Sequence, residues 1–344
     1  IFKTIVAKET DKSAFILSKV MAKSDDKTIS LVINNTIEKN NNNESKLSLK
    51  LIAEFSENNP QKYEIFSQSN QGQISNLVTS AIDEAASNQE DVNLITKVIS
   101  VSNEEINNII IKEVIKNSIK DKQTLSAKVL GLISEINPNK IDNFNDENKK
   151  NIMFKTNEVA FNQDQGLLND EIDLSGIVAN IIINTEFNTS TQMIDSLSNF
   201  LNDSNSKLSL KIVKNLTKYE NFEEKLEIIS DQTVIDAGNV KKLIENAIKE
   251  ISSESDIIIF KKIVIDSNDF ITDIIIDIGN EGDESNEIKV IEILDEIIKE
   301  DSIKIVKIIE DNKEKEIIKK IIKTNKPKVI KKIKEIYPID VSPN

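Results

Sequence analysis

The side chains that this sequence lacks limit the chemistry open to it. Its 344 residues contain no Cys, His, Trp or Arg. The absence of His removes the usual general base, the absence of Cys removes the thiolate nucleophile, and the absence of Arg removes the bidentate anion ligand. Two carboxylates could still hydrolyse a glycosidic bond. We therefore predict a protein that is not an enzyme and has no cofactor or catalytic residue, with a carboxylate-based hydrolase as a remote alternative.

One acidic segment has some features of a calcium loop. Carboxylates and glycines alternate between Asp277 and Ser285, and Gly282 is the sixth residue from Asp277. The twelfth residue is Ile288, however, where an EF-hand loop needs a bidentate Glu. We therefore interpret this segment as a solvated acidic turn and predict no metal site.

The polar landmarks of the chain recur at a fixed spacing. The motif Leu-Ser-x-Lys at 47–50 and the Asn-Pro pair at 59–60 return at 125–128 and 137–138, each shifted by 78 residues. A third copy follows, since Ser206–Lys211 repeats Ser45–Lys50. Self-similarity at a fixed period is typical of units that stack on their neighbours, so we predict an array of repeats about 80 residues long.

The spacing of apolar residues predicts that each repeat consists of several short helices. Ile106, Ile109, Ile110 and Val114 fall on one helical face. The Asn-Pro pairs should end the preceding helix, because a residue before proline disfavours the helical region. The isoleucine run at 257–260 has strand chemistry, but apolar and polar residues do not alternate there and Asn-Gly hairpin signals are missing. The fold class predicted is therefore all-α, an elongated α-solenoid.

The repeats predict a division of the chain into four parts and a tail. An irregular seam falls in the region 155–190, where the landmarks are lost. The predicted parts are residues 1–90 (repeat 1), 91–165 (repeat 2), 166–254 (repeat 3, after the seam), 255–337 (a C-terminal repeat with a Lys-rich helical cap) and 338–344 (a linker or tail).

The repeated motif Leu-Ser-x-Lys-x5-Ser-Glu-x-Asn-Pro-x-Lys, at 47–62 and 125–140, resembles HEAT-type and other right-handed α-solenoids. Among these is the helical N-domain of MgtE-type magnesium transporters. The chain also resembles the repetitive regions of giant bacterial surface or secreted proteins. The resemblance implies a fold of stacked short helices and assigns no functional residue.

Composition also gives expectations about location. A cysteine-free acidic chain suits an extracellular or cell-surface setting, with a cytoplasmic protein of biased codon usage as the alternative. No apolar run of eighteen residues occurs, so we predict no transmembrane segment. Because residues 1–6 lack an initiator Met and resemble the middle of a helix, we expect the chain to be a segment of a longer protein.

The charge is distributed unevenly along the chain. Thirteen lysines face seven acidic residues between Lys299 and Glu335, whereas the chain as a whole has a net charge of −14. Two interpretations remain open: a head-to-tail contact between copies, or a solvated end cap. The interspersed acids and scarce aromatics argue against nucleic acid and a membrane surface as partners. The lysines expected at a head-to-tail contact are Lys319, Lys320, Lys323, Lys331 and Lys332.

Repeats describe a scaffold rather than a site. We therefore predict a non-enzymatic structural or spacer segment of a larger surface or filament assembly. The alternative is a solenoid that binds a protein or peptide through an exposed apolar patch that includes Phe55, Tyr63 and Phe66. These three side chains could instead fill the core between helices.

Overall fold

The computed structural model describes residues 10–40, 46–118, 122–168, 172–200, 206–231, 234–266, 269–300 and 302–336. Within these ranges it contains helices and no strand, so the predicted all-α class is confirmed. The isoleucine run at 257–260 lies in a helix. Contacts divide the chain into two compact units, residues 1–197 and 198–344, which are described separately.

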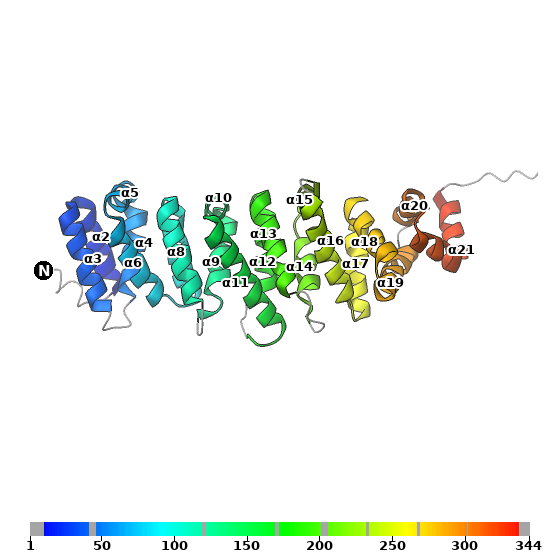
Figure 1. Ribbon diagram of the computed structural model, residues 1–344, viewed down its shortest axis with the longest axis horizontal. Helices are drawn as coiled ribbons and strands as arrows, with labels where there is room; N and C mark the ends of the chain where they lie inside the picture. The colour runs from blue at the N-terminus through cyan, green and yellow to red at the C-terminus, as the bar shows by residue number, and fades with distance from the viewer. Residues whose placement is uncertain are drawn as a thin grey trace, which may run out of the picture. The chain divides into compact units, whose positions relative to one another are not determined.

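In unit 1, helices that alternate along the chain pack into two rows (Figure 1). The first row is α2, α4, α7, α9 and α12, and the second is α3, α6, α8, α11 and α13; each helix contacts the next in its row. Two further helices are short and connect one row to the other along the chain: α5 connects α4 to α6, and α10 connects α9 to α11. The helices are α2 (Thr10–Lys23), α3 (Asp26–Asn40), α4 (Leu47–Asn58), α5 (Pro60–Ser69), α6 (Gln71–Glu84), α7 (Gln89–Val101), α8 (Glu104–Asn117), α9 (Leu125–Ile136), α10 (Asn139–Asp142), α11 (Asp146–Asp164), α12 (Leu174–Asn184) and α13 (Phe187–Leu197).

The helices end where the sequence landmarks predict. Asn59 has φ −144° and ψ 58°, and Asn137 has φ −158° and ψ 66°, so the residue before each proline leaves the helical region. A shift of 78 residues carries the bounds of α2, α3 and α4 onto those of α7, α8 and α9 to within one residue. The helix bounds thus follow the recurring landmarks, and the four-part division remains a prediction.

Phe55, Tyr63 and Phe66 are buried and fill the core around α4 and α5. The rings of Phe55 and Tyr63 meet edge to face with centroids 5.7 Å apart, and the Tyr63 hydroxyl lies 2.8 Å from that of Ser102. Burial raises the pKa of Tyr63 to about 12, against the opposing effect of this hydrogen bond. The interpretation of these side chains as an exposed binding patch is therefore wrong.

In unit 2, helices form three-helix groups as well as pairs. Helix α16 packs on α14 and α15, and α19 packs on α17 and α18; α16 and α19 also contact each other. Helix α21 bends at Asn325, two residues before Pro327. The elements are η2 (Ser198–Phe200), α14 (Leu208–Leu216), α15 (Phe222–Asp231), α16 (Val234–Lys249), α17 (Glu254–Asp266), α18 (Asp269–Glu281), α19 (Glu284–Glu300), α20 (Ser302–Asp311) and α21 (Glu316–Ile336).

The packing of α18 against α19 and α21 requires a glycine. A Cβ atom added at Gly279 would lie 2.8 Å from Val290 Cγ1 and would also clash with Ile317 Cδ1. We expect Gly279→Ala to lower the free energy of unfolding by about 1–3 kcal/mol, because overpacking forces helices apart. Urea unfolding followed by circular dichroism measures the effect.

The matched control is Gly238→Ala in α16, where an added Cβ meets nothing within 4 Å. Since Ala is the better helix former, this change should stabilise the unit by about 0.5–1 kcal/mol. A stabilising Gly279→Ala would contradict the close approach of these helices.

Candidate functional site

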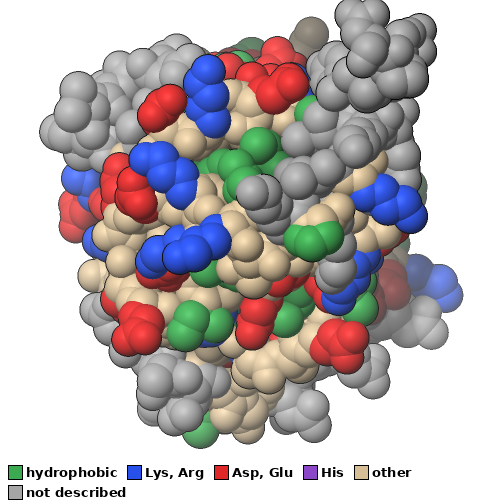
Figure 2. All heavy atoms as spheres, turned by 90° about the vertical axis from the view of Figure 1, so that its right-hand side faces the viewer, with side chains coloured by type: hydrophobic (Ala, Val, Ile, Leu, Met, Phe, Trp, Pro, Cys, Tyr) green, Lys and Arg blue, Asp and Glu red, His purple; other side chains and the backbone are tan. Residues whose placement is uncertain are grey.

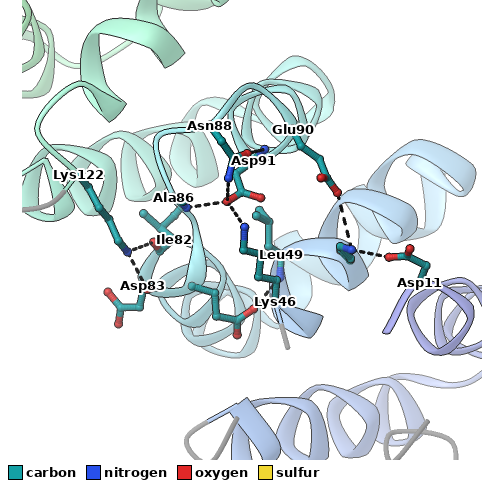
Figure 3. Close-up of polar contacts among 12 residues, drawn as sticks. Asp11, Lys46, Leu49, Ile82, Asp83, Ala86, Asn88, Glu90, Asp91 and Lys122 are labelled. Carbon is teal, nitrogen blue, oxygen red and sulfur yellow. Dashed lines mark hydrogen bonds and ion pairs between the residues drawn. The ribbon is translucent and has the colours of Figure 1, made fainter. Parts of the chain in front are cut away.

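A buried carboxylate that accepts several hydrogen bonds in unit 1 is that of Asp91, in the first turn of α7. Its side chain is 0% exposed. Asp91 Oδ2 accepts hydrogen bonds from Lys46 Nζ at 2.6 Å, from the Ala86 backbone N–H at 2.7 Å and from Asn88 Nδ2 at 3.1 Å (Figure 3). Asn88 Oδ1 in turn accepts the Asp91 backbone N–H. This arrangement joins the start of α4 to the start of α7.

Lys46 adopts a backbone conformation that favours glycine. Its φ of 50° and ψ of 27° lie in the left-handed region. A side chain there costs roughly 1–2 kcal/mol. The ion pair with Asp91 is the contact that a glycine at this position could not make.

Lys50, one turn further along α4, connects to the helices on both sides. Its Nζ lies 2.5 Å from Asp11 of α2 and 3.7 Å from Glu90 of α7 (Figure 3). The hydrogen bond to Asp11 raises the pKa of Lys50 above its ordinary value, although burial opposes the shift. Ionic contacts therefore run through three successive helices of one row.

Unit 2 contains the same arrangement at the corresponding residues. Asp256, in the first turn of α17, accepts hydrogen bonds from Lys207 Nζ at 3.0 Å and from the backbone N–H groups of Ser252 and Ser253 at 3.0 and 3.1 Å. Burial opposes ionisation of Asp256, but these hydrogen bonds outweigh it and hold its pKa below 3.8.

A second carboxylate completes each arrangement. Glu84, at the end of α6, accepts the backbone N–H groups of Ser48 and Leu49 at the start of α4. Glu250 likewise accepts those of Ser209 and Leu210 at the start of α14. Both therefore cap a helix that begins without a side-chain cap of its own. Burial raises the pKa of Glu84, and its hydrogen bonds oppose that shift.

An open polar groove of about 550 Å³ lies between α3 and α6. Glu38, Asp83 and Glu84 bring three carboxylates to its lining. The hydrolase alternative would need two carboxylates converging on a substrate atom. Glu84 already accepts hydrogen bonds from Ser48, Leu49 and Ser80, and Asp83 Oδ1 accepts one from Asn117. These two side chains thus take part in contacts between helices, and the hydrolase remains a prediction.

A second groove of about 340 Å³ lies in unit 2 between α14, the start of α15, and α17. Phe222, Ile259 and Ile263 give it an apolar lining, and three exposed lysines stand around it. They are Lys214, Lys218 and Lys262. Sequence analysis did not predict this groove. The spacing of Lys214, Lys218 and Lys262 along the chain does not show that the fold brings these lysines together.

The lysines predicted for a head-to-tail contact lie on α21, and part of this set is paired within the chain. Lys319 pairs with Glu316, and Lys320 pairs with Glu287 of α19. Lys323 and Lys331 are exposed, and the side chain of Lys332 lies outside the described residues. Figure 2 views the molecule from the right-hand side of Figure 1, where α21 lies. On this face lysines and acidic side chains are interspersed. The described part of this face is therefore mixed in charge.

A head-to-tail contact would also need apolar area beneath those lysines. Ile317, Ile318 and Ile321 of α21 are buried, so they do not offer this area to a partner. Contacts of α21 with α18, α19 and α20 cover them.

The acidic segment from Asp277 to Ser285 is helical over most of its length. Residues up to Glu281 belong to α18, and α19 starts at Glu284. Asp283 Oδ1 accepts the Asn286 backbone N–H at 2.9 Å and so caps α19. In the part of the chain that the structure describes, no group of three or more acidic residues is arranged to hold a metal ion.

Comparison with known proteins gives no family assignment: no protein-family model and no curated protein matches this sequence. Among the described helices, none combines the length and apolar character needed to span a membrane.

The ion pair of Lys46 can be separated from its backbone strain by two substitutions. Lys46→Met removes the ammonium and keeps the left-handed residue, whereas Lys46→Gly removes both. We expect Lys46→Met to cost about 1–3 kcal/mol, since it leaves a buried carboxylate uncompensated. Lys46→Gly should cost about 1 kcal/mol less. Urea unfolding measures both, with Lys97→Met, which breaks an exposed pair with Glu57, as a control expected below about 1 kcal/mol. A Lys46→Met protein as stable as the parent would show that the pair contributes no net stability, since this change keeps the left-handed residue.

The carboxylates of Asp256 and Glu84 have pKa values shifted in opposite directions, so they predict opposite dependences of stability on pH. Asp256 has a lowered pKa, so its stabilisation is present above pH 3.8 and is lost as the pH falls through the folded-state value. Asp256→Asn should therefore cost about 1–2 kcal/mol at pH 7 and progressively less as the pH falls below 3.8.

Glu84 has a raised pKa, so the parent loses stability as the pH rises from 4.5 through the folded-state value. Relative to the parent, Glu84→Gln should thus become more stable over that range. Unfolding free energies between about pH 2 and 8 test both signs, and parallel pH profiles for the two variants would contradict the assignment.

Proposed function

We propose that this protein is a non-enzymatic helical-repeat segment with a structural or spacer role in a larger assembly. The observation that carries the proposal is the recurrence of one interhelical arrangement: Lys46 with Asp91, and Lys207 with Asp256. In both places a buried carboxylate, a lysine from a preceding helix and backbone N–H groups hold successive helices together. Such contacts specify stacking rather than chemistry on a ligand.

The sequential contacts support the same proposal. Within unit 1, each helix of a row touches its immediate neighbours, which is the packing of stacked repeats. The stacking is in keeping with the resemblance to HEAT-type solenoids. Helices stacked in this way suit a spacer between other parts of a cell-surface or filament assembly.

The proposed spacer role predicts an extended molecule in solution. A compact globule of 344 residues would have a radius of gyration of about 20 Å. We expect small-angle X-ray scattering to give a clearly larger value that is independent of protein concentration. A radius near 20 Å would contradict the spacer proposal.

A binding role is the second candidate, and the unit 2 groove favours it. This groove combines apolar side chains with exposed lysines. Phe55, Tyr63 and Phe66 do not support a binding role, because they are buried.

A further inference from the structure

We propose that the groove between α14, α15 and α17 binds an acidic amphipathic helix of a partner protein. The proposal goes beyond the structural role, since it assigns a partner surface to unit 2. It depends on three properties of the groove: its lysines, its apolar lining and its helical walls.

The lysines around the groove differ from their neighbours in how they are bonded. Several lysines elsewhere in unit 2 form ion pairs with acidic residues of other helices: Lys207 with Asp256, Lys241 with Glu281, Lys261 with Glu300, and Lys307 with Asp269. Among the described residues, Lys214, Lys218 and Lys262 have no acidic partner; Lys218 Nζ donates only to Asn215 Oδ1. The contrast is sharpest between Lys261 and its neighbour Lys262. In a chain of net charge −14, three such ammonium groups around one groove form a distinct basic site.

The interior of the groove is apolar. Phe222 and Ile263 are buried at its base, and Ile259 is half-buried beside them. An inorganic anion would leave this apolar surface unused, whereas a ligand with large apolar side chains would cover it. The apolar contact would supply affinity and the lysines would set orientation, because exposed charge pairs are individually weak.

The walls of the groove favour a helix over an extended strand as the occupant. They consist of helices and helix ends and present no sheet edge to pair with. An amphipathic helix places its apolar side chains on one face at i, i+3 and i+4, with carboxylates flanking them. Its carboxylates would face the three lysines, and its apolar face would cover Ile259, the half-buried member of the apolar lining.

The test uses the full chain and a fluorescein-labelled helical peptide in which glutamates flank a Phe–Leu pair one turn apart. Fluorescence anisotropy at about 50 mM salt should show saturable binding that weakens toward about 300 mM salt, because screening shortens the range of charge attraction. Two control peptides carry lysine in place of glutamate, or alanine in place of Phe and Leu; both should bind at least about tenfold more weakly.

Matched protein variants locate the site. Lys214→Glu with Lys262→Glu reverses two groove lysines and should weaken peptide binding about tenfold or more. Lys249→Glu with Lys299→Glu makes the same change of charge at exposed lysines that pair within their own helices, and should bind like the parent. Ile259→Gln tests the apolar lining and should weaken binding several-fold without a change in the helical circular dichroism.

Three outcomes would overturn the proposal. These are no binding by the parent up to about 1 mM peptide, equal losses in the two double variants, and full competition by a small aromatic dicarboxylate such as terephthalate, which would indicate a small-anion site. Each is distinguishable from failure of the spacer proposal, because the radius of gyration is measured without the peptide.

Discussion

The interaction on which the stacking of unit 1 depends is the buried ion pair between Lys46 and Asp91. Removing a carboxylate from water is costly unless several donors replace the lost hydration. Asp91 Oδ2 receives such donors from Lys46, from the backbone of Ala86 and from Asn88, whereas Oδ1 is buried and accepts no hydrogen bond from the described residues. Ala86 and Asn88 lie directly before α7, so their bonds are local to Asp91, and the bond from Lys46 is the one that joins the start of α4 to α7. An apolar contact in the same place would be less directional than this charged hydrogen bond.

The core by itself cannot set the register of these helices. Its buried side chains are largely Ile, Leu, Val and Ala, whose contacts are short-ranged but not directional. Glu84 and Glu250 add direction, since each satisfies two backbone N–H groups at the start of another helix. Burial of Glu84 opposes its ionisation, as its raised pKa shows, so this specificity has an energetic cost.

Local features of the fold could be predicted from the sequence, whereas long-range pairing could not. The Asn-Pro pairs and the 78-residue shift located helix ends, because both act through the backbone of adjacent residues. The repetition also contained the positions of the ionic arrangement, since Lys46 and Lys207 occupy matching places in Ser45–Lys50 and Ser206–Lys211. Nothing in that match identified their partners, because Asp91 and Asp256 lie more than forty residues further along the chain. The burial of Phe55, Tyr63 and Phe66 likewise depends on neighbours that spacing alone does not specify.

The absence of Arg shapes what charge can do in this protein. Lysine is a point charge on a flexible stem, so Lys46 and Lys207 can each reach a single carboxylate oxygen on a neighbouring helix. Lysine also selects poorly among ligands of different geometry. It lacks the planar guanidinium of arginine, which binds a carboxylate through two parallel hydrogen bonds and so fixes its orientation. Around the unit 2 groove, Lys214, Lys218 and Lys262 can therefore attract and orient an acidic partner but do little to select its shape. Selection among acidic partners must come from the apolar lining, where Ile259 is half-buried above the buried side chains of Phe222 and Ile263 and a mismatched ligand side chain leaves area exposed to water.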